Sequence, residues 1–438
     1  SLMTAASCQR GQAPALSAAT PAAAGNVVRR QNADEASRPG QVVIRFKLPK
    51  TQLAIENYAK ANQLKVLRVL SGGKVVLFQH FKAGVSTQNV IRSFSASTSV
   101  ESSQPNYVYT AAQLYPRGYA PQPTTTYRRF NENTAPGNAP VTGQYALAAL
   151  GLPQAWQTTQ GNPNIKIAVI DSGVDPTHPD LVANLLPGAA FIGSKNTDTQ
   201  RPAWTDELGH GTHVAGIIAA MANNVGVTGV APFCKILPVK VLDEWGNGDT
   251  VSVSQGVEWA TEQGAQVMNL SLRVHQRDPV MEEAINKALA KNTVIVAATG
   301  NDGGVREAFP EAFDGVIGVG SVDEQRTRAN TSNYGDWISV VAPGVNILST
   351  KPTYPLHENP TPGAPYEMDS GTSMASPAVA GIAALLLSKN PQLTAKEVKW
   401  RIEQSATDLG EPGFDQYYGH GLVNASAALN MGEMVAFR

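Results

Sequence analysis

Two patterns of hydrophobic and polar positions follow one another along the chain. Between residues 41 and 111, short apolar stretches predict strands at 42–47, 64–70, 74–81 and 106–109 and helices at 51–62 and 86–95. This β-α-β-β-α-β order is typical of a small ferredoxin-like α+β domain.

Beyond residue 144, strands and helices alternate. The pattern predicts strands at 165–171, 235–242, 266–271, 293–298 and 316–321, and helices at 210–224, 250–263 and 278–291. The first and fourth strands are almost wholly apolar, as strands covered on both faces are. The expected fold is therefore α/β, with a doubly wound parallel sheet. A last apolar run, 378–387, predicts a buried helix with Pro377 in its first turn.

Two segments lack any such periodicity. Residues 1–40 are rich in Ala, Ser, Gln and Pro and predict a disordered leader, and residues 112–143 predict an exposed linker rich in proline and threonine. The expected organisation is a leader (1–40), a small domain (41–111), a linker (112–143) and a large domain (144–438).

Composition narrows the range of partners. The 438 residues are 42% hydrophobic and 16% charged, with a formal net charge of −1, so bulk charge gives no reason to bind nucleic acid or an anionic membrane surface. We expect no membrane span. Cys234 lies in an apolar run and is interpreted as a buried free thiol. Cys8 follows small residues, as in a lipoprotein anchor, but lacks the apolar stretch that should precede it.

Candidate chemistry gathers at the ends of predicted elements. Asp171 ends the first strand of the large domain, Asn301 follows the fourth, and ligands in such sheets bind at the carboxyl ends of strands. Ser373 lies at a helix start, where free N–H groups favour developing negative charge, although an ordinary helix cap has the same pattern. A serine needs a base to become nucleophilic, and His210 is a residue type with a suitable pKa.

Three segments, taken together, resemble the subtilisin-like serine proteases (subtilases, peptidase S8), nearest to the subtilisin and thermitase branches. They are Ala168-Val169-Ile170-Asp171-Ser172-Gly173, His210-Gly211-Thr212-His213-Val214-Ala215-Gly216 and Gly371-Thr372-Ser373-Met374-Ala375-Ser376-Pro377. The resemblance covers roughly residues 144–428. It implies a triad of Asp171, His210 and Ser373, and an oxyanion hole made by Asn301 and the Ser373 backbone N–H.

The same resemblance extends to the N-terminal part. Residues 41–111 resemble the family's I9-type inhibitory propeptide through their element order and the ending Gln104-Pro105-Asn106-Tyr107-Val108. The expected protein is a monomeric precursor of a secreted serine endopeptidase acting on polypeptides through an acyl-enzyme. Its propeptide would aid folding, inhibit the active site and be removed by self-cleavage within 110–143.

Family resemblance also implies where a peptide substrate lies. It would form a strand between Ser271-Leu272-Arg273 and Gly246-Asn247-Gly248, with Ala298 and Ala308 near the primary specificity pocket. Arg273 and Val274 replace glycines that are usual in the family. The Arg273 side chain either narrows the pocket or points outward and adds positive charge. We expect small to medium apolar residues at the cleaved position, with acidic residues tolerated nearby.

A structural calcium ion is a further expectation. The loop 222–227 offers free carbonyls and an amide oxygen, ligands that calcium prefers, although a plain helix-ending turn reads the same way. By resemblance, the ligands would be the side chains of Asp180 and Asn223 and the backbone of Met221, Val225 and Val227.

Two alternatives belong to other functional classes. A metal-dependent hydrolase would use His178, His210 and His213, but the chain lacks a His-Glu-x-x-His pattern. A non-catalytic binding protein would be held inactive by a propeptide that is never removed.

Overall fold

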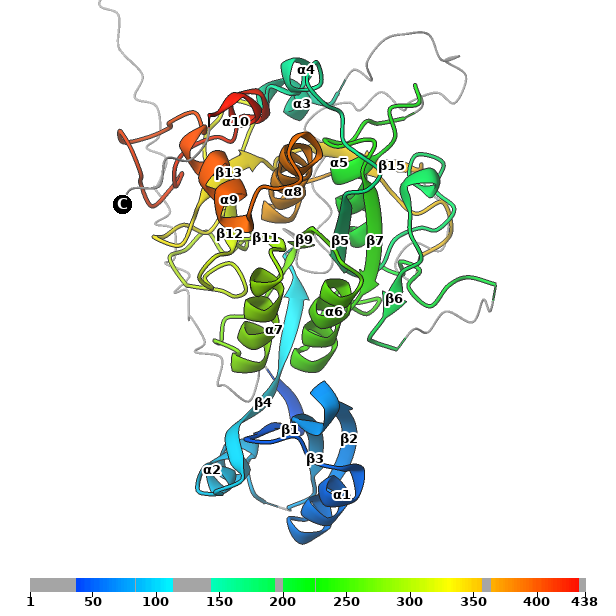
Figure 1. Ribbon diagram of the computed structural model, residues 1–438, viewed down its shortest axis with the longest axis vertical. Coiled ribbons are helices and arrows are strands. Elements are labelled where there is room, and N and C mark those ends of the chain that lie inside the picture. The colour runs from blue at the N-terminus through cyan, green and yellow to red at the C-terminus, as the bar shows by residue number, and fades with distance from the viewer. Residues whose placement is uncertain are drawn as a thin grey trace, which may run out of the picture.

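The computed structural model describes residues 37–82, 84–112, 143–193, 200–224, 226–356 and 364–432 (Figure 1). Most of the predicted leader, nearly all of the predicted linker, Cys8 and the proposed calcium ligand Val225 lie outside these residues.

The N-terminal domain is a four-stranded antiparallel sheet covered by two helices. Strands β1 (Ser37–Phe46), β2 (Leu64–Leu70), β3 (Val75–His80) and β4 (Val100–Ala111) pair in the order β4-β1-β3-β2. Helices α1 (Gln52–Ala61) and α2 (Thr87–Ser95) begin at the capping side chains of Thr51 and Ser86. A short 3₁₀ helix, η1 (Ser71–Gly73), joins β2 to β3. The element order is the predicted one.

Two boundaries of this domain differ from the prediction. β1 begins at Ser37, inside the predicted leader, because Ser37 pairs with Tyr107 of β4. β4 was expected only over 106–109 but spans twelve residues, because it pairs with β1 at one end and with the large domain at the other. Long-range pairing of this kind leaves little trace in the local pattern.

The large domain contains the predicted parallel sheet. Its strand order is β13-β12-β11-β9-β5-β7-β6, and every pair in it is parallel. The strands are β5 (Lys166–Asp171), β6 (Ala189–Ala190), β7 (Lys235–Lys240), β9 (Val267–Leu270), β11 (Val294–Ala298), β12 (Ile317–Val322) and β13 (Val340–Pro343). The doubly wound α/β prediction is confirmed.

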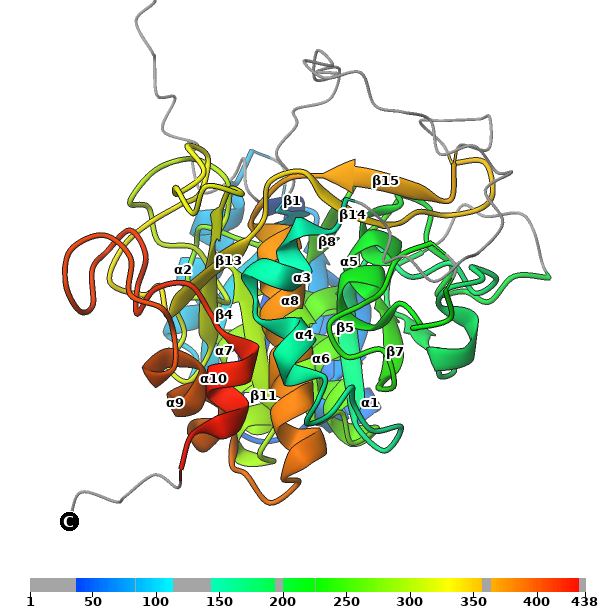
Figure 2. The ribbon, with the colours of Figure 1, turned by 90° about the horizontal axis from the view of Figure 1, so that it is seen from above.

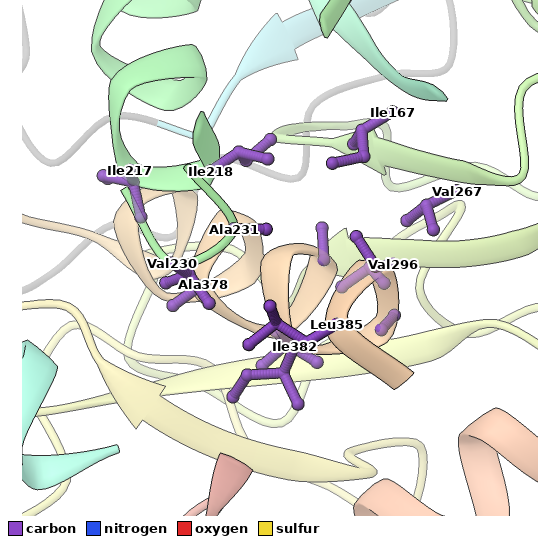
Figure 3. Packing of buried hydrophobic residues seen from close by; sticks show 14 of the residues in the cluster. Ile167, Ile217, Ile218, Val230, Ala231, Val267, Val296, Ala378, Ile382 and Leu385 are labelled. Carbon is purple, nitrogen blue, oxygen red and sulfur yellow. The ribbon is translucent and has the colours of Figure 1, made fainter. Parts of the chain in front are cut away.

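Helices cover both faces of this sheet and form a hydrophobic core on each. Because successive side chains of a strand point to opposite faces, they belong to different cores. One core contains Ile167 and Val169 with helices α4 (Leu152–Ala155), α5 (His210–Ala219), α8 (Thr372–Lys389), α9 (Ala395–Gln404) and α10 (Ala425–Asn430). The other contains Ala168 and Ile170 with α6 (Thr250–Glu262) and α7 (Pro279–Ala290). Figure 3 shows the first core, where side chains of α5 and α8 meet those of the strands at Ile167, Val267 and Val296.

Smaller elements complete the large domain. α3 (Tyr145–Ala149) precedes α4, η2 (Val182–Asn184) follows β5, and β14 (Ile347–Thr350) pairs with β15 (Tyr366–Asp369). Figure 2 shows α10 lying beside α4, where the Ala425 N–H donates to the carbonyl oxygen of Leu150 at 2.8 Å. Helix α5 ends at Ala219, not at the predicted 224. The Ala220 N–H still donates to the Gly216 carbonyl, but that of Met221 leaves the helix and donates to the carbonyl of Asp180.

One helix of the described residues, α8, is long and apolar enough to cross a membrane. Of that 18-residue stretch, 89% is buried inside the protein. α8 is therefore a core helix of the large domain.

The two domains share an apolar interface. Val43, Leu70, Val75 and Leu77 of the small sheet form one cluster with Val251 of α6 and Val280 of α7. Figure 1 shows β4 running up from the small domain, between α7 and α6, towards the parallel sheet. Arg45 also forms an ion pair with Glu283 of α7. The C-terminal end of β4 is thereby directed at the large domain.

Candidate active site

The end of β4 lies as an added strand between two edges of the large domain. On one side Val108, Tyr109 and Thr110 pair antiparallel with β8 (Asn247–Asp249). On the other side Thr110 and Ala111 pair antiparallel with β10 (Leu272–Arg273). Ala112 was expected to open the linker, but its N–H donates to the carbonyl oxygen of Ser271 at 3.0 Å. The segment therefore ends inside the groove.

The carbonyl oxygen of Ala112 is held by two side chains. It accepts a hydrogen bond from the Ser373 Oγ at 2.6 Å and another from the Nδ2 of Asn301. The Oδ1 of Asn301 accepts from the N–H and the hydroxyl of Thr372, which fixes the direction of its amide. The sequence suggested that the backbone N–H of Ser373 would be the second donor. Among the hydrogen bonds of the described residues, Ser373 instead donates to this oxygen through its hydroxyl.

Asp171 and His210 form a buried, hydrogen-bonded pair. His210 Nδ1 lies 2.8 Å and 3.0 Å from the two carboxylate oxygens of Asp171, and both side chains are fully buried. The other ring nitrogen, Nε2, is also buried and has no hydrogen-bond partner among the described residues. A ring that carries its proton on Nδ1, towards Asp171, therefore keeps an unused acceptor on Nε2.

Each of these residues stands at the end of an element. Asp171 is the last residue of β5, His210 the first of α5 and Ser373 the second of α8, so all three meet at the carboxyl edge of the sheet. Gly371 precedes Ser373 with a φ of +148°, and a Cβ there would lie 3.0 Å from Asn301 Nδ2 and 3.2 Å from the Ala112 oxygen. The glycine leaves room for that carbonyl.

The charge of Asp171 controls the protonation of His210. Burial disfavours the charged ring, but the charge and hydrogen bond of Asp171, together with the charges of Asp369 and Asp206, outweigh it, so the pKa of His210 lies above its ordinary value of 6.5. His213, one turn further along α5, has no such partner, and burial lowers its pKa to about 4. His210 is thus the protonatable histidine of this helix near neutral pH.

A family model described as the subtilase family matches residues 162–421. The chain belongs to the subtilase family. Thermophilic serine proteinase from Bacillus sp. (strain AK1) is 36% identical over 89% of this chain and 87% of its own length. Subtilisin Savinase from Lederbergia lenta is 39% identical over 65% of this chain and 97% of its own length. This subtilase is accordingly a serine protease.

A solved structure extends the likeness to both domains. Fervidolysin from Fervidobacterium pennivorans, described as a keratinolytic enzyme related to subtilisin, aligns with a TM-score of 0.73 and 30% sequence identity. The alignment covers 90% of this subtilase and 61% of the fervidolysin chain. This alignment therefore extends beyond residues 162–421, which the family model matches, into the N-terminal domain.

Most of the predicted substrate-binding residues meet β4. Ser271, Leu272 and Arg273 hold it on one side, and Gly246, Asn247 and Gly248 hold it on the other, with the Gly246 carbonyl accepting from the Ala111 N–H at 2.9 Å. Ala298 and Ala308 are both fully buried. Among the described residues, neither alanine forms a hydrogen bond with Ala112.

Arg273 lies across the groove wall. A Cβ on Gly300 would lie 2.9 Å from the Arg273 Cδ, so the side chain covers the backbone next to Asn301. Both terminal nitrogens of its guanidinium bond the carboxylate of Asp302. Burial works against the charge of Asp302, but Arg273 holds the pKa of that carboxyl below its ordinary value. The positive charge of Arg273 is therefore paired with a carboxylate at the groove wall.

Two acids near the groove were missed in the sequence. Asp278 caps α7 and contacts β4, although its position before Pro279 looked like an ordinary helix start. Glu311 is 1% exposed, and neither of its carboxylate oxygens has a hydrogen-bond partner among the described residues. Burial raises the pKa of Glu311 to about 8, against the nearby charge of Arg273. The sequence feature that could have identified Glu311 is the position of an acid inside the apolar run 308–313.

The predicted calcium loop surrounds Asp180, which is fully buried. Its Oδ1 accepts from the Asn223 Nδ2 at 3.0 Å, and its Oδ2 accepts from the Val227 N–H at 3.0 Å. Its backbone carbonyl accepts from the Met221 N–H. Asn223 thus presents its amide nitrogen to Asp180, where the prediction required its oxygen. Four of the five predicted ligands are together, and Val225 lies outside the described residues.

Nothing in the described ranges supports the metal-hydrolase alternative. There, no three His, Cys, Asp or Glu side chains form a group suited to a metal ion. His178 bonds the Pro365 carbonyl and the Asp180 N–H, and His213 bonds the Glu367 carbonyl. Cys234 is a buried free thiol, as predicted.

Proposed function

We propose that Ser373, His210, Asp171 and Asn301 hydrolyse peptide bonds through an acyl-enzyme. The Ser373 Oγ attacks the carbonyl carbon while His210 Nε2 takes its proton, and Asp171 holds Nδ1 and stabilises the imidazolium. The Asn301 amide donates to the oxygen as it gains negative charge. When the C–N bond breaks, His210 returns the proton to the leaving amine, and water then releases the acyl group by the reverse steps.

The N-terminal domain is proposed to be the inhibitory propeptide of this enzyme. The observation that carries the proposal is the carbonyl oxygen of Ala112, which accepts hydrogen bonds from both Ser373 and Asn301. A substrate carbonyl must meet these two groups in the reaction. The bond between Ala112 and Gln113 is therefore the proposed site of self-cleavage, which narrows the predicted range of 110–143 to one bond.

The proposal includes a role in folding. The apolar cluster shared by Val43, Val251 and Val280 joins the N-terminal domain to the starts of α6 and α7. A parallel sheet built from distant strands folds slowly, so an early contact that brings α6 and α7 together would speed it. Secretion and a monomeric state belong to the same proposal.

A structural calcium ion is proposed at Asp180. The carboxylate is fully buried, and within the described ranges no lysine, arginine or histidine side chain forms a salt bridge with it. The oxygens of Asp180 and Asn223 and the backbone of Met221 and Val227 would hold the ion once the Asn223 amide turns over. Its contribution would be to the stability of this loop, with no part in the reaction.

Labelling of Ser373 by a fluorophosphonate tests the catalytic proposal. We expect a covalent adduct on the Ser373-containing peptide and hydrolysis of casein, both appearing only after the N-terminal domain has been released. A non-catalytic binding protein would form no adduct even after that release. Such a result would reject the enzyme mechanism and favour the binding alternative.

A further inference from the structure

We propose that the groove has a subsite selective for tyrosine, four residues before the cleaved bond, and that Asp278 determines this specificity by accepting the phenolic hydroxyl. The inference rests on the proposed function, in which Ala112 directly precedes the cleaved bond and Tyr109 is therefore the fourth residue back. No other described contact of β4 with the groove combines a fully buried side chain with a charged acceptor for a specific hydroxyl.

Tyr109 enters the large domain completely. Its side chain is 0% exposed, and it belongs to the same apolar cluster as Leu272 and Met281. At the end of the ring, the hydroxyl donates to Asp278 Oδ2 at 3.0 Å. The backbone of Tyr109 pairs with Gly248, as any strand laid in the groove would. Main-chain pairing therefore brings whatever side chain stands at this position to the carboxylate.

The large domain itself holds the carboxylate in position. Asp278 Oδ1 accepts from the N–H groups of Val280 and Met281 at the start of α7, and Oδ2 accepts from the Thr250 hydroxyl at 2.6 Å. All three donors remain when the N-terminal domain leaves. A mature enzyme thus keeps an oriented carboxylate at the end of an apolar subsite, the arrangement that suits an aromatic ring with a hydroxyl group.

The other contacts around this carboxylate differ in whether a short substrate could also make them. Thr250 also accepts from the Tyr107 N–H at 3.0 Å, a backbone contact that any substrate residue except proline would make. Gln104 donates to Asp278 Oδ1 at 2.7 Å, but Gln104 lies eight residues before Ala112, in the part of β4 that pairs with β1. The tyrosine hydroxyl is therefore the side-chain contact that a short substrate reproduces.

A phenylalanine at this position would fill the apolar part of the subsite and leave Asp278 without its fourth donor. Hydrogen bonds to charged acceptors are stronger than neutral ones, and a buried acceptor left unpaired also loses solvation. The expected discrimination is roughly 10- to 100-fold in kcat/KM in favour of tyrosine.

The test uses the mature enzyme obtained from the full chain and two fluorogenic peptides that carry residues 106–114. One peptide has the natural tyrosine at the position of Tyr109 and the other has phenylalanine there, with Tyr107 kept in both. We expect the tyrosine peptide to be cleaved about 10- to 100-fold more efficiently, after the residue that corresponds to Ala112. Equal kcat/KM values for the two peptides would overturn the inference, and this comparison needs no enzyme variant.

A substitution then assigns the effect to the carboxylate. Asp278→Asn retains an oxygen for the helix cap and replaces Oδ2 by an N–H₂ donor, so the ratio of kcat/KM for the tyrosine peptide over the phenylalanine peptide should fall to within a few-fold of unity. Glu282→Gln removes a charge from the first turn of the same helix, where Glu282 pairs with Arg277 on the surface, and should leave the preference intact. A preference that survives Asp278→Asn would overturn the role of Asp278. If wild type cleaves neither peptide, the proposed endopeptidase function fails as well, a result distinct from cleavage without preference.

Discussion

The hydroxyl of Ser373 and the carbonyl oxygen of Ala112 lie 2.6 Å apart although 261 positions separate the two residues in the chain. The contact exists because β4 leaves the N-terminal domain and continues as a strand between β8 and β10. The end of β4 therefore occupies the groove as an added strand, with the Ala112 carbonyl beside Ser373. As the proposed inhibitory propeptide, the N-terminal domain would need only one cleaved bond to become a product.

The pH dependence of activity should follow His210. Catalysis needs the neutral ring. The pKa of His210 lies above 6.5 because the charges of Asp171, Asp369 and Asp206 together outweigh burial, so kcat/KM should fall as the pH drops through a value above 6.5. Asp171→Asn removes the raising charge. It should move the acid limb to lower pH and reduce kcat roughly 10⁴-fold, a typical loss for this substitution in such triads. A pH–rate profile with the same acid limb in both proteins would contradict this assignment.

The size of the residue accepted before the cleaved bond should depend on Arg273. Replacing it by glycine uncovers Gly300 and removes the side chain that Asp302 holds across the groove wall. We expect the kcat/KM ratio for phenylalanine over alanine at this position to rise about 10-fold or more.

Asp302→Asn is the matched control for Arg273, because it weakens the ion pair while leaving the arginine side chain in place. It should change the phenylalanine-to-alanine ratio much less than Arg273→Gly does. If Arg273→Gly leaves the ratio unchanged, Arg273 does not limit the pocket.

Glu311 should make stability depend on pH in an unusual direction. Its pKa is raised from 4.5 to about 8 in the folded protein, so the folded state binds the proton more tightly than the unfolded state does. The stabilisation is fully present below pH about 4.5 and is lost as the pH rises towards about 8. Both proteins compared carry Ser373→Ala, which prevents self-digestion. Over this pH range, the protein that retains Glu311 should lose stability relative to the one that also carries Glu311→Gln.

Melting temperatures across that range measure the effect of Glu311. Glu411→Gln changes an exposed carboxyl group and should give a curve parallel to wild type. Parallel curves for Glu311→Gln as well would show that Glu311 titrates normally.

Calcium should stabilise the folded protein through Asp180. An ion present at 100 times its dissociation constant adds about 2.7 kcal/mol to the free energy of unfolding, so EGTA should lower the melting temperature of the Ser373→Ala protein by several degrees. Asp180→Asn should remove most of the response to calcium. If EGTA leaves the melting temperature unchanged, the loop is a plain helix-ending turn, as the hydrogen bonds from Asn223 and Val227 to Asp180 would also allow.

The hydrophobic pattern and the capping residues correctly predicted the elements that depend on local sequence. The apolar strands around Ile167 and Val296, and the caps at Thr51 and Ser86, give the right elements in the right order. Boundaries failed where a distant partner decides them. α5 stops at Ala219 because Asp180 takes the backbone of Met221, and β4 extends to Ala111 because β8 and β10 pair with it.

The residues of the site divide in the same way, into those marked by local sequence and those that depend on distant contacts. Asp171, His210, Asn301 and Ser373, the proposed catalytic residues, could be named from the sequence because motifs at the ends of elements mark them. Asp278 was not found because a helix cap and a ligand for tyrosine use the same carboxylate, and the second role depends on β4 arriving from 169 positions away. Glu311 gave only the weak signal of an acid in an apolar run, since its burial follows from packing of the whole domain.

Self-cleavage between Ala112 and Gln113 is the most direct test of the account. Intact mass and N-terminal sequence of the full chain would be followed over time for wild type, Ser373→Ala and Ser388→Ala, a control serine at the far end of α8. The account predicts that wild type and Ser388→Ala yield a large fragment beginning at Gln113, while Ser373→Ala stays whole. Cleavage of Ser373→Ala at the same rate, or a wild-type chain that stays whole, would contradict it.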